Sequence, residues 1–314
     1  MRKESVIKLL LSLRQVTRAF PYERYLLTLF PVFALLLASS KIGASEILLV
    51  LIAFAFALAA GFIYNAVCDA KKDPKAKNAI TRGDLSTKGA ICALVLSLFV
   101  ATVLFTWASQ SILAIFLFAV YLYLGAAYSG LGVRFKEGVL GPFVASFMLW
   151  CGPPLVVLIS FGYLNISAVL LVLGLFGVYS SHEIEHTLID HDLDVAYNNQ
   201  TFAVVLGPQH ASIVAYIALT LGSVFLLVSA YVLPPSFSTA IFLLFALLFI
   251  ISIVSTAWYT SRRNYDVHAG VRLTAAPYVV TALYIITFGL MVLRLPLILV
   301  FFALWFYVVS PWPS

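Results

Sequence analysis

The sequence predicts an all-α integral membrane protein. Hydrophobic residues make up 63% and charged residues only 10% of the 314 residues, whereas soluble domains carry roughly 25% charged residues. Apolar runs of about 20 residues recur along the chain, and each is long enough to cross the hydrocarbon core of a bilayer. Because basic residues in such a chain mainly report its orientation, the net charge of +6 does not indicate nucleic-acid binding.

The first 20 residues are predicted to form an amphipathic helix on the membrane surface. Lys8, Arg14 and Arg18 interrupt the short apolar stretch, which argues against a cleavable signal peptide. Basic residues that alternate with Ile and Leu are typical of an interfacial helix. We therefore divide the chain into an N-terminal segment (1–20), a membrane domain (21–295) and an apolar C-terminal tail (296–314), which is either a tenth span or an interfacial segment.

About nine spanning helices are expected in the membrane domain. Their predicted ranges are 22–40, 46–68, 88–108, 111–128, 139–160, 164–188, 210–231, 238–260 and 275–293. Alternate crossings place the N-terminus and the segments after helices two, four, six and eight on one side. That side holds all five His, all of the 19 Lys and Arg except Lys41 and Arg294, and all of the 13 Asp and Glu except Glu46. The positive-inside rule makes it cytoplasmic, and the acids and histidines gathered there indicate a polar chemical site.

The first candidate site lies at the end of the second helix. Asn65, Asp69 and Asp73 are spaced four residues apart, so they are predicted to share one helical face. Pro74 is expected to end this helix. Carboxylate and amide oxygens suit Mg²⁺ better than zinc, and polar residues at membrane depth are costly and usually functional. A solvated acidic helix end is the less favoured interpretation.

Cations surround this acidic row in the sequence. Lys77 and Arg82 follow Pro74, and Arg134 and Lys136 follow the fourth helix. Cations beside hard oxygen ligands suit a metal-bound diphosphate, whose oxygens they hold or whose departure they favour. Arg134 and Lys136 are equally well explained as markers of the cytoplasmic side.

A second polar row follows the sixth helix. His182, His186, Asp190 and Asp194 repeat every four residues and are predicted to share a face. The same stretch also fits the H-E-x-x-H pattern of zinc hydrolases, with Glu183 as the general base and Asp190 as a third ligand. That alternative, an intramembrane metalloprotease, leaves the first acidic row unexplained. A transporter is a further alternative, but its acidic residues belong near the bilayer midplane, whereas those of this chain are predicted at helix ends.

Three patterns in this order resemble the UbiA superfamily of membrane-embedded prenyltransferases, over about residues 20–293. They are Asn65-x3-Asp69-x3-Asp73 with Ile80-Thr-Arg-Gly83 after it, Tyr128-Ser with Lys136, and Asp190-x3-Asp194 with Thr201-Phe-Ala-Val-Val-Leu-Gly207 after it. The chain departs from many members at His186-Thr187, where they have Lys-Asp, and at Ala66, where they have Asp.

The resemblance implies a helical bundle around a lipid-open cavity. It implies Mg²⁺-dependent transfer of an isoprenyl group from an isoprenyl diphosphate to a lipophilic acceptor, in a prokaryotic cell membrane and with the site facing the cytoplasm. No obligate protein partner is indicated. The implied metal ligands are Asn65, Asp69, Asp73, Asp190 and Asp194, and the residues implied to bind the diphosphate are Lys77, Arg82 and Lys136. Our further candidates for substrate contacts are Asn65, Tyr128, Arg134 and His186.

Overall fold

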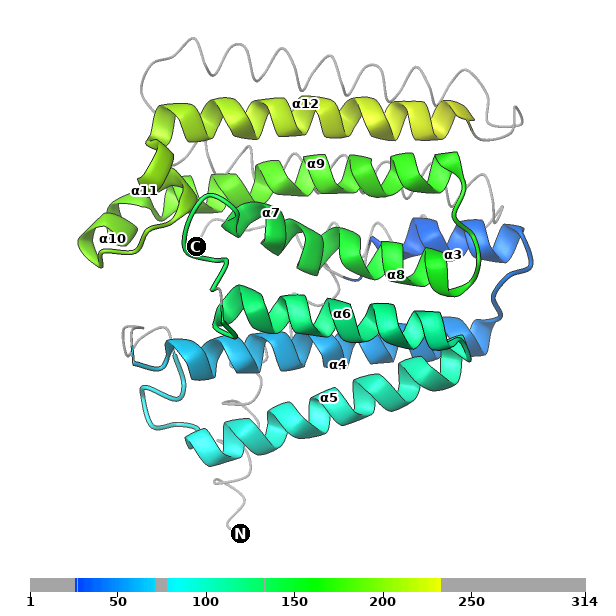
Figure 1. Ribbon diagram of the computed structural model, residues 1–314, viewed down its shortest axis with the longest axis horizontal. Helices are drawn as coiled ribbons and strands as arrows, with labels where there is room; N and C mark the ends of the chain where they lie inside the picture. Colours follow the sequence, from blue (N-terminus) through cyan, green and yellow to red (C-terminus); the bar gives the residue numbers. More distant parts are fainter. Residues whose placement is uncertain (1–25, 27, 72–77, 133, 233–314) are drawn as a thin grey trace, which may run out of the picture. The chain divides into compact units, whose positions relative to one another are not determined.

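The protein is all-helical in the part of the chain that the structure describes, which is residues 26, 28–71, 78–132 and 134–232 of a computed structural model (Figure 1). The elements in chain order are α3 (Leu29–Ala38), α4 (Ala44–Asp69), α5 (Thr87–Ser109), α6 (Ile112–Ser129), α7 (Gly141–Ser146), the π-helix η1 (Phe147–Cys151), α8 (Gly152–Ser160), α9 (Ile166–Ile189), α10 (His191–Ala196), α11 (Phe202–Leu206) and α12 (Pro208–Val232). They divide into two compact units, one with α4 to α8 and one with α3 and α9 to α12.

Six helices are long and apolar enough to cross a membrane. They are Ala44–Asp69, Thr87–Ser109, Ile112–Ser129, Gly141–Ser160, Ile166–Ile189 and Pro208–Leu226. These confirm, to within a few residues, the spans predicted second to seventh. The first predicted span is represented by the ten residues of α3. The segment 1–20, the spans at 238–260 and 275–293, and the tail 296–314 lie outside the described residues.

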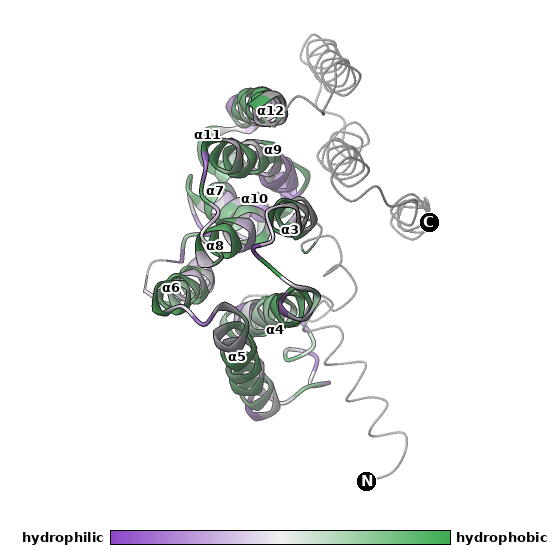
Figure 2. Ribbon diagram, turned by 90° about the vertical axis from the view of Figure 1, so that its right-hand side faces the viewer, coloured by the Kyte–Doolittle hydropathy of each residue, from purple (hydrophilic) through white to green (hydrophobic). Residues whose placement is uncertain are grey.

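An aromatic cluster forms the centre of the first unit. The ring of Phe54 on α4 makes edge-on contacts with Phe105 of α5 and with Phe118 and Tyr121 of α6, at centroid distances of 5.7, 5.4 and 5.5 Å. All four residues are buried. Large apolar side chains on α5, among them Trp107, are exposed, and the helix is apolar along most of its length (Figure 2). Such a surface is suited to contact with lipid.

The span predicted at 139–160 is interrupted by η1, and Pro153 leaves one carbonyl of η1 without a backbone donor. Within η1 the Gly152 amide donates to the Phe147 carbonyl, five residues back. In the same pattern Pro153 would donate to Met148, but proline has no N–H. The Tyr121 hydroxyl donates to the Met148 carbonyl instead, at 2.9 Å. A side chain of α6 thereby satisfies the carbonyl that the proline leaves unpaired.

Two glycines allow α9 and α12 to pack closely in the second unit, where the helices run side by side (Figure 1). A Cβ atom on Gly177 would lie 2.6 Å from the Cα atom of Gly222, so no side chain fits between the two backbones. Farther along the pair, Ser167 and Ser229 each donate their hydroxyl to the other's carbonyl, at 3.1 and 2.9 Å. Small residues with reciprocal polar contacts are a common way to join helices in lipid.

Candidate functional site

Helix α4 ends at Asp69, and side chains of the following loop satisfy its terminal carbonyls. The Asn78 amide donates to the Ala66 carbonyl and the Thr81 hydroxyl to the Ala70 carbonyl, both at 2.8 Å. The predicted stop at Pro74 is therefore wrong, because these contacts end the helix earlier. Asn65 and Asp69 share the end of α4 as predicted.

Helix α4 ends at Asp69, four residues before the third predicted member of this row. Asp73 and Lys77 lie in 72–77, outside the described residues.

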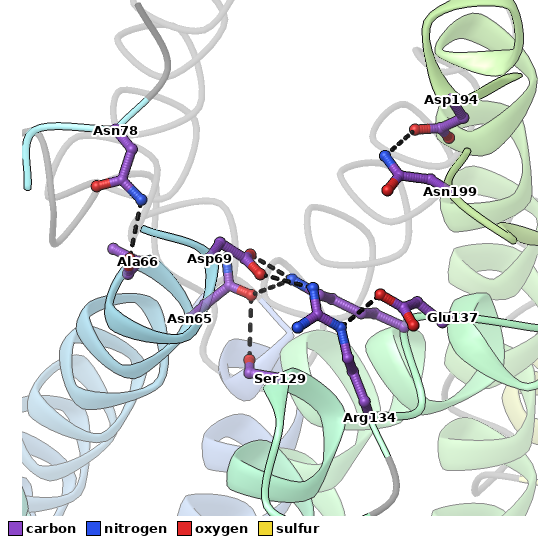
Figure 3. Close-up of polar contacts among 10 residues, drawn as sticks. Asn65, Ala66, Asp69, Asn78, Ser129, Arg134, Glu137, Asp194 and Asn199 are labelled. Carbon is purple, nitrogen blue, oxygen red and sulfur yellow. Dashed lines mark hydrogen bonds and ion pairs between the residues drawn. The ribbon is translucent and has the colours of Figure 1, made fainter. Parts of the chain in front are cut away.

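The Asp69 carboxylate is almost fully buried and pairs with two cations. Its residue is 5% exposed. Arg134 Nη2 lies 2.9 Å from Asp69 Oδ1, and Lys136 Nζ donates to Asp69 Oδ2 (Figure 3). The sequence placed both cations near this acidic row, and the structure confirms it. Burying a carboxylate is costly unless it is paired and hydrogen-bonded, and the two cations provide that pairing.

The side-chain oxygen of Asn65 contacts the same lysine. Lys136 Nζ lies 3.3 Å from Asn65 Oδ1, and the Ser129 hydroxyl donates to that oxygen at 3.2 Å. One ammonium thus lies between the oxygens of Asn65 and Asp69. Sequence reasoning missed Ser129. Ser129 directly follows Tyr128 and is buried at the end of α6. This position next to a predicted substrate contact could have indicated its role.

The loop after α6 carries both cations to this position. The Phe135 and Lys136 amides donate to the Ala127 and Tyr128 carbonyls, at 3.3 and 3.2 Å, so the loop folds back over the end of α6. Arg134 has a backbone φ of 50°, in the left-handed region that most side chains avoid. The backbone carbonyl of Tyr128 therefore has a structural role, which the sequence did not predict.

A second carboxylate holds the other side of the arginine. Arg134 Nε pairs with Glu137 Oε1 at 2.6 Å, a contact that sequence reasoning missed. We refer below to Asn65, Asp69, Ser129, Arg134, Lys136 and Glu137 as the Asp69 cluster. Arg82, the remaining described cation of the prediction, pairs with Asp84 through its Nε atom at 2.7 Å.

The second polar row lies in the other unit, at the end of α9. Nε2 of buried His182 and Nε2 of His186 lie 3.1 Å apart, which confirms their predicted shared face. Helix α9 ends at Ile189, and Asp190 connects it to α10. The amide of Asp190 bonds to the His186 carbonyl, and that of Asp194 to the Asp190 carbonyl, at 3.1 and 2.8 Å. The four-residue hydrogen-bond pattern therefore continues across the junction.

Asp190 and Asp194 have different surroundings. Asp190 is exposed. Asp194 accepts a hydrogen bond from Asn199 Nδ2 at 3.1 Å (Figure 3). It accepts another from the Thr201 hydroxyl at 2.8 Å. These bonds link α10 to the start of α11 and fix the orientation of the Asp194 carboxylate. Asn199 was not anticipated from the sequence, although an amide five residues after an acidic helix turn could have suggested it.

Zinc ligation by the histidine pair is not supported. Among the residues that the structure describes, no three His, Cys, Asp or Glu side chains are arranged to hold a metal ion. His182, His186 and Asp190 thus do not form the three-ligand zinc site that a metalloprotease needs.

Comparison with known proteins assigns the family. A model of the UbiA prenyltransferase family matches residues 26–269, which is most of the chain. The chain belongs to the UbiA prenyltransferase family. The resemblance drawn from the acidic motifs is confirmed, and the metalloprotease and transporter alternatives are not favoured. No curated protein sequence is significantly similar to this UbiA-family chain.

Solved structures share the UbiA fold at low sequence identity. A digeranylgeranylglyceryl phosphate synthase is 16% identical with a TM-score of 0.69, over 91% of this chain and 99% of the other. A UbiA homologue from Archaeoglobus fulgidus has TM-scores of 0.62 bound to GPP and Mg²⁺ and 0.66 bound to DMAPP and Mg²⁺. Each of these is 16% identical, over 90% of this chain and 100% of the other. These likenesses confirm the all-helical membrane fold.

Proposed function

We propose that this UbiA-family enzyme transfers an isoprenyl group from an isoprenyl diphosphate to a hydrophobic acceptor, with release of diphosphate and dependence on Mg²⁺. The observation that carries the proposal is the convergence of Asn65 and Asp69 oxygens on one ammonium, with a guanidinium beside it. Oxygen ligands next to cations are what a metal-bound diphosphate requires. The structures of the Archaeoglobus fulgidus homologue with Mg²⁺ and GPP or DMAPP support this chemistry.

The donor set of the Asp69 cluster fits Mg²⁺. Asn65 Oδ1 and Asp69 Oδ2 are hard oxygen atoms that already approach one positive charge. We propose that Asn65, Asp69 and Asp73 hold one ion and that Asp190 and Asp194 hold another. When bound, Mg²⁺ neutralises the charge that builds on the departing diphosphate.

The cations of the chain would bind the diphosphate. Arg134 presents a planar fork of donors that matches phosphate oxygens, and Lys136 adds a flexible point charge. Both are held within 3.3 Å of oxygens of the acidic row, so they need only rotate to exchange partners. Lys77 and Arg82 are proposed to add further contacts, with Arg82 exchanging Asp84 for phosphate. Stabilising the leaving group in this way lowers the barrier to breaking its C–O bond.

The acceptor and orientation complete the proposal. Tyr128 and His186 are proposed to contact the substrates, and the acceptor is a hydrophobic molecule, aromatic or lipid, that enters from the bilayer. The lopsided distribution of Lys and Arg supports a site on the cytoplasmic side of the membrane, and we propose that this is a prokaryotic cell membrane. The fold similarity to a digeranylgeranylglyceryl phosphate synthase makes a glycerol-lipid acceptor one member of the panel to be tested.

The proposal is tested by measuring diphosphate release from the purified full-length protein. Isoprenyl diphosphates of several chain lengths are incubated with aromatic and glycerol-lipid acceptors, with and without Mg²⁺. We expect release that requires Mg²⁺ and falls by about 10²–10³-fold in Asp69→Ala and in Asp190→Ala. Asp192→Ala, at a side chain that is fully exposed at 103%, serves as the matched control and should retain activity.

Two outcomes would contradict the proposal. Transfer that persists in both Asp69→Ala and Asp190→Ala would refute the assignment of the metal ligands. Stoichiometric zinc on the wild-type protein that is lost in His182→Ala would favour hydrolytic zinc chemistry instead.

A further inference from the structure

We infer that Lys136 is a built-in counter-ion that competes with Mg²⁺ for Asn65 and Asp69, so that the metal binds tightly only together with a diphosphate. The inference rests on the proposed function. Its starting point is the position of the Lys136 ammonium, which donates to Asn65 Oδ1 at 3.3 Å and to Asp69 Oδ2. A metal ion held by the same two oxygens requires the ammonium to leave them.

The charges of the Asp69 cluster balance without a metal ion. Asp69 and Glu137 supply two negative charges, and Arg134 and Lys136 supply two positive charges. A divalent ion bound alone would add two positive charges beside a carboxylate side chain that is 7% exposed, where water screens them poorly. A diphosphate that arrives with the metal supplies negative charge, and it offers new acceptors to the displaced ammonium.

The construction of the loop allows this exchange to be local. The Lys136 amide is bonded to the Tyr128 carbonyl at 3.2 Å. The backbone of Gly141 packs closely on the Lys136 carbonyl, since a Cβ on Gly141 would lie 3.0 Å from that oxygen. The backbone of Lys136 is thereby held, and its long side chain can rotate. Arg134 keeps Glu137 as a second partner when Asp69 changes ligand.

The consequence is positive coupling between metal and diphosphate. Each ligand relieves the charge imbalance that the other creates, and the coupling must be equal in both directions. Removing the positive charge at Lys136 should therefore strengthen binding of the metal alone and weaken the benefit that diphosphate brings. A lysine that only binds diphosphate would leave binding of the metal alone unchanged when substituted.

The test measures metal binding rather than turnover. Mn²⁺ affinity is measured by electron paramagnetic resonance on the full-length protein in lipid nanodiscs, alone and with geranyl S-thiolodiphosphate. Lys136→Met and Lys136→Gln remove the charge, and Lys136→Arg retains it. Lys88→Met removes a charge from an exposed position at the start of α5 and is the matched control. The rise in melting temperature on adding Mg²⁺ alone gives a second measurement for any variant of low stability.

We expect Lys136→Met and Lys136→Gln to bind Mn²⁺ alone about tenfold more tightly than the wild type, and to lose most of the enhancement by the thiolodiphosphate. Lys136→Arg and Lys88→Met should behave like the wild type. Unchanged or weaker binding of Mn²⁺ alone in both neutral variants would overturn the inference. If the wild type binds no Mn²⁺ even with the thiolodiphosphate, the proposed function itself fails, and the two failures are thus distinguishable.

Discussion

Arg134 Nη2 lies 2.9 Å from Asp69 Oδ1, in a pair that joins the loop after α6 to the end of α4. The same guanidinium pairs with Glu137 through Nε at 2.6 Å. Arg134 holds this position with a backbone φ of 50°, which costs energy for a side chain other than glycine. The two carboxylates compensate for that cost and fix the direction of the fork.

Replacing the planar guanidinium of Arg134 by a single ammonium group should weaken substrate binding. In Arg134→Lys the positive charge remains, but one nitrogen cannot contact Asp69 and Glu137 as the guanidinium does. We expect KM for the isoprenyl diphosphate to rise about tenfold, the loss of roughly one charge-assisted hydrogen bond, with a smaller change in kcat. Initial rates over a range of substrate concentrations give both constants. Lys88→Arg should match the wild type, and an unchanged KM in Arg134→Lys would contradict this role.

Ser129 should set the orientation of the Asn65 amide. Its hydroxyl donates to Asn65 Oδ1 at 3.2 Å, which directs that oxygen toward Lys136. In Ser129→Ala the Asn65 amide loses one of the two donors that hold its oxygen in place, so we expect Mn²⁺ affinity in the presence of a thiolodiphosphate to fall by about 10–100-fold. Ser223→Ala, at another buried serine, is the control. Equal metal affinity in the two variants would show that Ser129 is not needed.

Thr201 should support the second acidic motif in the same way. Its hydroxyl donates to Asp194 Oδ2 at 2.8 Å, while Asn199 binds the other carboxylate oxygen. In Thr201→Val the carboxylate loses one of these two bonds, and we expect about a tenfold weaker metal affinity with little change in melting temperature. Thr187→Val is the control, because it removes a hydroxyl that donates to the Ile184 carbonyl within α9. A drop of the same size in that control would refute the specific role of Thr201.

The hydroxyl of Tyr121 should stabilise the broken span. In Tyr121→Phe the Met148 carbonyl loses its 2.9 Å bond, and Pro153 has no N–H to replace it. A buried carbonyl without a donor costs about 1–3 kcal/mol, so the melting temperature in detergent should fall by several degrees. Tyr123→Phe, at a position on the same helix that is 56% exposed, should not change it. Equal melting temperatures for the two variants would contradict this account.

Packing between α9 and α12 should not tolerate a methyl group at Gly222. A Cβ atom there would lie 2.4 Å from the Val178 nitrogen and 2.8 Å from the Gly174 carbonyl oxygen. We expect Gly222→Ala to destabilise the protein by about 1–3 kcal/mol. At Gly61 no atom lies within 4 Å of the added Cβ, so Gly61→Ala should preserve stability or improve it slightly. A thermal unfolding series compares the two, and a stable Gly222→Ala variant would show that the helices can separate at no cost.

The helical spans and the family were predictable from the sequence, because long apolar segments in lipid have few alternatives to a helix. The four-residue spacing also predicted that Asn65 and Asp69 share the end of α4 and that His182 and His186 share a face of α9. The residues at which helices end were harder to predict. The end of α4 at Asp69 depends on Asn78 and Thr81, which bond to carbonyls 11 or 12 residues away in the chain.

The sequence by itself determined which residue types the candidate site has: oxygen ligands at the end of α4 and after α9, and cations after α6. Only the tertiary structure decided that Asp69 lies between Arg134 and Lys136, that Ser129 orients Asn65, and that Thr201 and Asn199 hold Asp194. The physical reason is the distance along the chain over which each kind of interaction acts. Helical periodicity acts over a few residues, whereas Asp69 and Lys136 are 67 residues apart and meet only because α4 packs against α6.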